Sequence, residues 1–164
     1  GESTQTTTSV VSAFSRMLEL QRSRLLEYQT GWVKIDTQAE LAKTNLEQCG
    51  SVPAQTALTN EVLPLLQESN TALEDVATIL LALSDIGARA DSAANFAEFE
   101  EATKDYDALI SGNEPYETVS FPAAQDFVTL AQDVLDTGGI KNPPLAYERM
   151  KELSESCSVP PLTS

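Results

Sequence analysis

Apolar residues recur along the first third of the chain at alternating steps of three and four. Counted from Val11, these positions are Phe14, Leu18, Gln21, Leu25, Tyr28, Trp32, Ile35, Ala39, Ala42 and Leu46. All of them are apolar except Gln21. This spacing is typical of a helix that buries one seam against partner helices. It predicts a helix over about 10–48, roughly 55 to 60 Å long at 1.5 Å per residue. The Cys49-Gly50 pair suits its end, because glycine takes the left-handed cap conformation without penalty.

A second seam of similar spacing predicts a helix over about 53–90. Its members are Val62, Leu66, Ser69, Leu73, Val76, Leu80, Leu83, Gly87 and Ala90. Pro64 interrupts the pattern, because a proline inside a helix removes a hydrogen bond and clashes with the preceding turn. We therefore expect the helix either to kink at Pro64 or to begin anew after Thr59 or Asn60.

Three shorter helices are predicted in the rest of the chain, over about 92–111, 122–137 and 143–156. Asp91 or Ser92 suits the cap of the first, and Asn142 followed by Pro143 suits the start of the last. No alternating strand pattern of useful length occurs. The predicted fold class is therefore all-α, a mainly antiparallel bundle of about five helices.

The length of 164 residues is near the usual size of one domain. We expect a single helical domain over 10–158. It is preceded by a flexible tail over 1–9 and followed by a short tail over 159–164.

Cys49 and Cys157 lie in polar stretches that suit helix ends. Solitary buried cysteines usually have apolar neighbours instead. In an up-and-down bundle the first and fifth helices run the same way, which places the two cysteines at corresponding ends. We expect a disulfide worth roughly 4 to 5 kcal/mol on the chain-entropy model, and hence a periplasmic or extracellular protein. Free thiols or a metal site are the alternatives.

The net charge of −15 is unevenly placed along the chain. Up to Gln48 there are five basic and six acidic residues, and beyond it five basic and nineteen acidic. This balance makes nucleic acid an unsuitable partner. No run approaches the roughly 20 apolar residues of a membrane span, but the Thr/Ser-rich start would suit the tether of a lipid-anchored precursor. In these general features the chain resembles small helical bacterial lipoproteins and periplasmic accessory proteins.

The chain contains no histidine, and this removes most catalytic constellations. A serine or cysteine nucleophile normally needs such a base, and catalytic zinc sites usually need such a ligand. Glycine-rich phosphate loops are missing as well. We therefore expect no cofactor, no metal and no enzymatic activity; an enzyme that uses only carboxylates, tyrosine or lysine is the alternative.

Three carboxylates and one tyrosine are candidates for binding a partner. Glu98, Glu101 and Asp105 share one helix face at spacings of three and four, and Tyr116 follows a proline in a predicted loop. We predict that these residues bind another protein, a basic partner, through an acidic face. The alternative for the carboxylates is a solvated face that keeps the protein in solution.

Phe14, Tyr28 and Trp32 are aromatic residues on the first seam. They are predicted either to belong to the core or to line a gap that admits an apolar small molecule. The sequence thus favours a non-catalytic binding or structural protein, such as an inhibitor, immunity factor or accessory subunit. A carrier of an apolar molecule is the second hypothesis.

Overall fold

The computed structural model describes residues 2–111 and 143–162 of the chain. These residues form four helices and no strand, so the predicted all-α class is confirmed. The count is four and not five, because the helix expected over 122–137 lies outside the described residues. No helix among the described residues is both long and apolar enough to cross a membrane.

Helix α1 spans Glu2–Cys49 and begins eight residues before the predicted start. The seam is confirmed: its members from Leu18 to Leu46 are all buried, including the polar Gln21. The helix ends where the sequence predicts, because Gly50 has a φ of 65°, a conformation that residues with a side chain rarely adopt.

The second long helix consists of three consecutive segments, α2 (Val52–Ala57), the π-helical turn η1 (Leu58–Val62) and α3 (Leu63–Asp91). Ser51 caps α2, since its side chain accepts a hydrogen bond from the N–H of Ala54. Pro64 has no N–H to donate, and the turn before it widens so that the N–H of Leu63 donates to the carbonyl of Leu58. The helix therefore neither stops nor restarts at the proline.

The chain divides into two compact units, to which both α1 and α3 contribute. Unit 1 comprises Gly1–Glu27 and Glu74–Gln132, and unit 2 comprises Tyr28–Leu73 and Asp133–Ser164.

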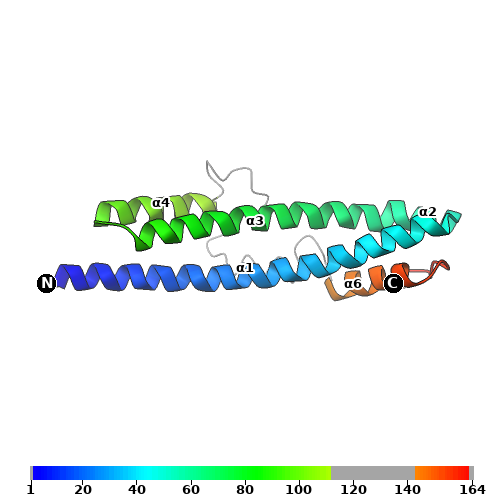
Figure 1. Cartoon of the computed structure of the whole chain (residues 1–164), viewed down its shortest axis with the longest axis horizontal. Coiled ribbons are helices and arrows are strands. Elements are labelled where there is room, and N and C mark those ends of the chain that lie inside the picture. The colour runs from blue at the N-terminus through cyan, green and yellow to red at the C-terminus, as the bar shows by residue number, and fades with distance from the viewer. Residues whose placement is uncertain (1, 112–142, 163–164) are drawn as a thin grey trace. The chain divides into compact units, whose positions relative to one another are not determined.

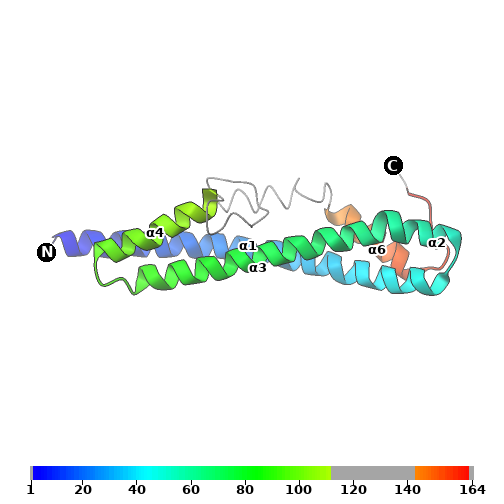
Figure 2. The ribbon, with the colours of Figure 1, turned by 90° about the horizontal axis from the view of Figure 1, so that it is seen from above.

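Unit 2 contains α6 (Pro143–Glu155), which lies beside the C-terminal part of α1 (Figure 2). Its core is formed by small and aliphatic residues from α1, α2, η1, α3 and α6, namely Ala39, Ala42, Leu46, Ala54, Ala57, Val62, Leu66, Met150 and Leu153. The predicted disulfide between Cys49 and Cys157 is present, with their Cα atoms 5.3 Å apart. Asn45 adds to this junction, because its side-chain amide donates to the carbonyls of Leu153 and Ser156 at the end of α6.

Unit 1 contains α4 (Phe96–Ser111), which lies along the end of α3 (Figure 1). Phe14 of α1 contacts the rings of Phe99 and Tyr106, and the amide of Gln21 donates to the hydroxyl of Tyr106 at 2.7 Å. The contacts advance in the same direction along both helices, so α1 and α4 run parallel. The predicted start of α4 at residue 92 was wrong, because Asn95 provides the cap.

Candidate functional site

The three carboxylates predicted to bind a partner are already engaged within unit 1. Glu98 caps its own helix: its side chain accepts from the N–H of Ala94 at 2.7 Å, and its own N–H donates to Asn95 Oδ1 at 3.0 Å. Glu101 forms an exposed ion pair with Lys104 at 3.6 Å. Asp105 forms an ion pair with Arg89 of α3. The remaining member of the set, Tyr116, lies outside the described residues.

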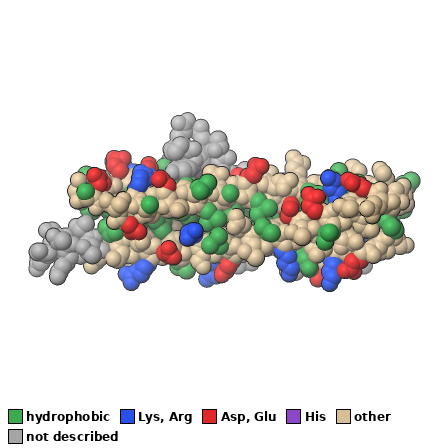
Figure 3. Space-filling view, viewed as in Figure 1, with side chains coloured by type: hydrophobic (Ala, Val, Ile, Leu, Met, Phe, Trp, Pro, Cys, Tyr) green, Lys and Arg blue, Asp and Glu red, His purple; other side chains and the backbone are tan. Residues whose placement is uncertain are grey.

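Arg89 connects α4 to α3. Its guanidinium binds Asp105 on α4 and, through Nε, Asp85 Oδ2 on its own helix at 3.0 Å. The hydrogen bond with Asp105 is the largest cause of the raised pKa of Arg89, so the side chain stays cationic. Part of the acidic face therefore serves to hold α4 in place. In Figure 3, acidic and basic side chains accordingly lie together over α4 and the adjoining end of α3.

A different row of α4 residues forms no ion pair with the rest of the described chain. Phe96, Glu100, Thr103 and Asp107 follow one another at steps of four, three and four, and therefore share one face of the helix. We call these four residues the α4 strip. Phe96 is 51% exposed, while Glu100 and Asp107 are exposed and form no ion pair with another described residue. The hydroxyl of Thr103 donates to the carbonyl of Glu100, which satisfies the one polar group between the two carboxylates.

The α4 strip lies beside the buried side of the same helix. Phe99, Ala102, Tyr106 and Leu109 are buried, and the ring of Phe96 lies 6.1 Å from that of Phe99. An exposed aromatic ring is thus supported by a buried one, at the end of a row of carboxylates. The sequence contains a signal for this row, because Phe96 and Glu100 are four residues apart, but the spacing of Glu98, Glu101 and Asp105 favours the neighbouring face.

The aromatic residues predicted to line an apolar gap are distributed between the two units. Phe14 meets Phe99 and Tyr106 edge to face in unit 1, with ring centroids 5.6 Å apart in each pair. In unit 2, Tyr28 and Trp32 are buried, and their ring centroids lie 6.2 Å apart. Such edge-to-face contacts are typical of aromatic packing in a core. The binding of an apolar molecule by these residues stays a prediction.

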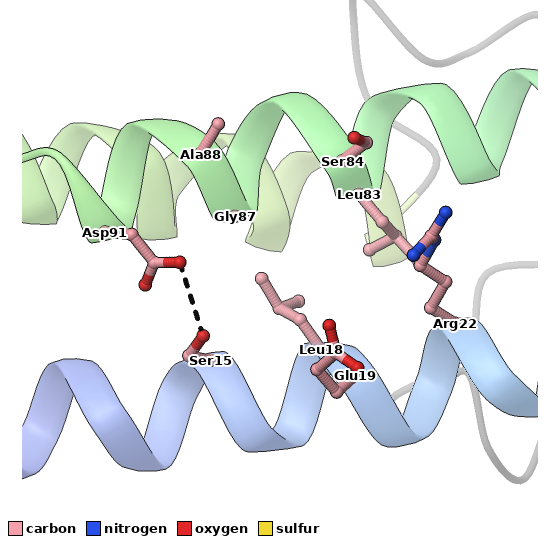
Figure 4. A pocket seen from close by; sticks show the side chains of 9 residues that line it. All are labelled: Ser15, Leu18, Glu19, Arg22, Leu83, Ser84, Gly87, Ala88 and Asp91. Atoms are coloured by element: carbon pink, nitrogen blue, oxygen red, sulfur yellow. Dashed lines mark hydrogen bonds between the residues drawn. The ribbon is translucent and has the colours of Figure 1, made fainter.

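A hollow in unit 1 lies between α1 and α3 (Figure 4). Its volume is about 150 Å³, whereas sites for drug-sized ligands usually measure about 300 to 1,000 Å³. Leu18, Leu83 and Gly87 form its apolar part, and the hydroxyl of Ser15 faces Asp91 Oδ2 at 3.5 Å across it. Arg22 and Glu19 also line the hollow, so its size and charge do not favour an apolar ligand.

Metal-binding side chains do not gather in groups of three or more among the described residues. No protein-family model, curated protein or solved structure matches the chain. The residues and their geometry are therefore the basis of any functional inference.

Proposed function

We propose that this chain is a non-catalytic binding protein of the periplasm or cell surface, and that its α4 strip binds a protein partner. The partner would present basic side chains next to an apolar one. The observation that carries this proposal is the half-exposed ring of Phe96 in line with Glu100 and Asp107, two exposed carboxylates that no described cation neutralises.

This combination suits recognition better than a carboxylate row alone. An aromatic side chain can anchor a contact by burying a large apolar area, and it can also receive an arginine over its face. The carboxylates accelerate association with a basic surface and set its orientation. A partner arginine between Phe96 and Glu100 would use both effects at once.

The α4 strip is held in a fixed geometry, which reduces the entropy lost on binding. Glu98 and Asn95 fix the first turn of α4, and Arg89 ties the middle of the helix to α3. The carboxylates predicted from the sequence would thus support the surface, while their neighbours make the contact.

The proposed location draws support from the disulfide, because such bonds persist in oxidising compartments and are rare in the cytosol. Inhibitors, immunity factors and accessory subunits are the classes of binding protein that fit this setting. Each acts by occupying another protein and needs no catalytic group.

The proposal can be tested with a fluorescently labelled amphipathic peptide of arginine and leucine, whose binding is followed by anisotropy. We expect the double variant Glu100→Gln with Asp107→Asn to bind about tenfold more weakly than the wild type, and Phe96→Ala several-fold more weakly. The matched control is Glu40→Gln with Glu47→Gln, which changes the net charge equally on exposed positions of unit 2.

If the control pair weakens binding as much as the α4 pair, the peptide senses only the net charge and the proposed surface is wrong. Binding that is unchanged at high ionic strength would contradict the electrostatic part, because exposed charges are screened there. Retained binding in Phe96→Ala would contradict the role of the ring as an anchor.

A further inference from the structure

A second exposed surface of unit 1 has the opposite character to the α4 strip. Three apolar side chains of α1 are exposed: Val10 at 42%, Met17 at 36% and Leu20 at 54%. Two exposed arginines accompany them, Arg16 just before Met17 and Arg24 four residues after Leu20. Arg16, Leu20 and Arg24 lie on the side of the helix away from the buried Leu18 and Leu25, and Val10 and Met17 lie at the edge of that side, nearer the buried seam. We call Val10, Arg16, Met17, Leu20 and Arg24 the α1 strip.

The two arginines of the α1 strip are available for pairing. Among the residues that the structure describes, Arg16 forms no ion pair and Arg24 pairs only with Glu27 of its own helix, at 3.5 Å. That pair is exposed on both sides, and such pairs contribute about 0 to 1 kcal/mol, so Arg24 can exchange its partner at little cost.

We propose that the α1 strip of one copy of the chain binds the α4 strip of a second copy. This inference rests on the proposed function of the α4 strip and names its partner. Arg16 and Arg24 are eight residues apart, about 12 Å along a helix, and Glu100 and Asp107 are seven residues apart, about 10 Å. Two ion pairs can therefore form together between helices that lie side by side, with Leu20 against the methyl group of Thr103.

The apolar residues favour one direction of this pairing. With the helices parallel, Arg16 faces Glu100, and Phe96 meets the apolar surface near Val10. With the helices antiparallel, Phe96 would instead approach Glu27. The parallel arrangement buries the exposed ring, so it is the one we infer.

Each copy carries both strips, and a two-fold axis along the helices lets both contacts form in one dimer. The strips are small and the net charge of −15 opposes association of two copies, so the complex is weak and transient. We expect a dissociation constant of roughly 10 µM to 1 mM. Association is strongest at moderate ionic strength, where the long-range repulsion is screened and contact pairs persist.

Charge reversal on either strip tests the proposal directly. The first variant carries Arg16→Glu with Arg24→Glu, and the second carries Glu100→Lys with Asp107→Lys. Each variant alone faces like charges in the dimer, so its self-association, measured by sedimentation velocity up to about 1 mM, is expected to weaken at least tenfold. In an equimolar mixture each altered strip meets one of opposite charge, and the mixture is expected to form the dimer again.

The proposal is overturned if the wild type keeps the monomer mass throughout this concentration range, or if either charge-reversal variant alone associates like the wild type. It is also overturned if the equimolar mixture forms no dimer while both variants retain wild-type helicity. The peptide assay separates this result from failure of the proposed function. A chain that stays monomeric but binds the cationic peptide through Glu100 and Asp107 has a functional α4 strip and a different partner.

Discussion

Arg149 binds Glu61 through two contacts, from Nε to Oε1 at 2.7 Å and from Nη2 to Oε2 at 2.9 Å. The same guanidinium donates to the carbonyl of Pro160 and to Glu152. The side chains of Arg149 and Glu61 are only 12% and 19% exposed. One arginine of α6 thus joins η1 and the C-terminal segment within unit 2, and the hydrogen bond with Glu61 is the largest cause of its raised pKa.

Replacing Arg149 with methionine is expected to reduce the free energy of unfolding by about 2 to 3 kcal/mol, because Glu61 would remain as a largely buried charge without its partner. Lys151→Met removes an exposed charge from the same helix and should change stability little. Chemical denaturation measures both. Adding Glu61→Met to Arg149→Met should recover part of the loss; a purely additive double variant would contradict coupling of the pair.

Loss of the disulfide is expected to destabilise unit 2. The bridge spans a sequence separation of 108, and the chain-entropy model gives roughly 4 to 5 kcal/mol for a loop of this length. Cys49→Ser with Cys157→Ser should therefore lower the melting temperature, as should reduction of the wild type. Hydrogen exchange should show the largest loss of protection in α6. Equal protection of α6 with and without the bridge would contradict this expectation.

Glu98 and Glu100 are two residues apart, and we expect their substitution to have different effects, on stability for Glu98 and on binding for Glu100. Glu98→Ala removes a hydrogen bond to the first turn of α4 and is expected to cost about 1 kcal/mol of stability. Glu100→Ala is expected to leave stability nearly unchanged and to weaken binding of the cationic peptide. Thermal unfolding and anisotropy on the same samples check both statements, and the opposite assignment would restore the prediction made from the sequence.

Burial raises the pKa of Glu68 above its usual range. A carboxyl group whose pKa is higher in the folded state favours folding when protonated, so the native protein loses stability as the pH rises from the unfolded pKa through the folded one. Glu68→Gln should consequently be more stable than the wild type at neutral pH and equal to it below about pH 4. Chemical denaturation from about pH 4 to neutral pH tests the sign of this stability difference. A wild type that is more stable than Glu68→Gln at neutral pH would refute the prediction.

The sequence predicted the parts of the fold that follow from periodicity. The seam of α1 was placed correctly even at Gln21, because a single polar residue cannot shift a helical phase set by its neighbours, and Tyr106 supplies its hydrogen bond. The disulfide was also predicted, since Cys49 and Cys157 lie in polar stretches that suit helix ends.

Long-range and local polar contacts were less predictable. No period marks the pairing of Arg149 with Glu61, which lies 88 residues away and depends on how α6 packs. Pro64 signalled a disturbance, but not the π-helical turn that absorbs it. At the candidate site, Asn95 and Glu98 have the spacing of a capping motif, which predicts the hydrogen bond between them from the sequence alone.

The bond between Cys49 and Cys157 also determines what a protease can achieve. A single cut anywhere between these residues opens the backbone but releases no fragment, because the two pieces remain covalently joined. A nicked protein would migrate as one species on a non-reducing gel and as two on a reducing gel. One such cut can therefore remain invisible until a reductant is added.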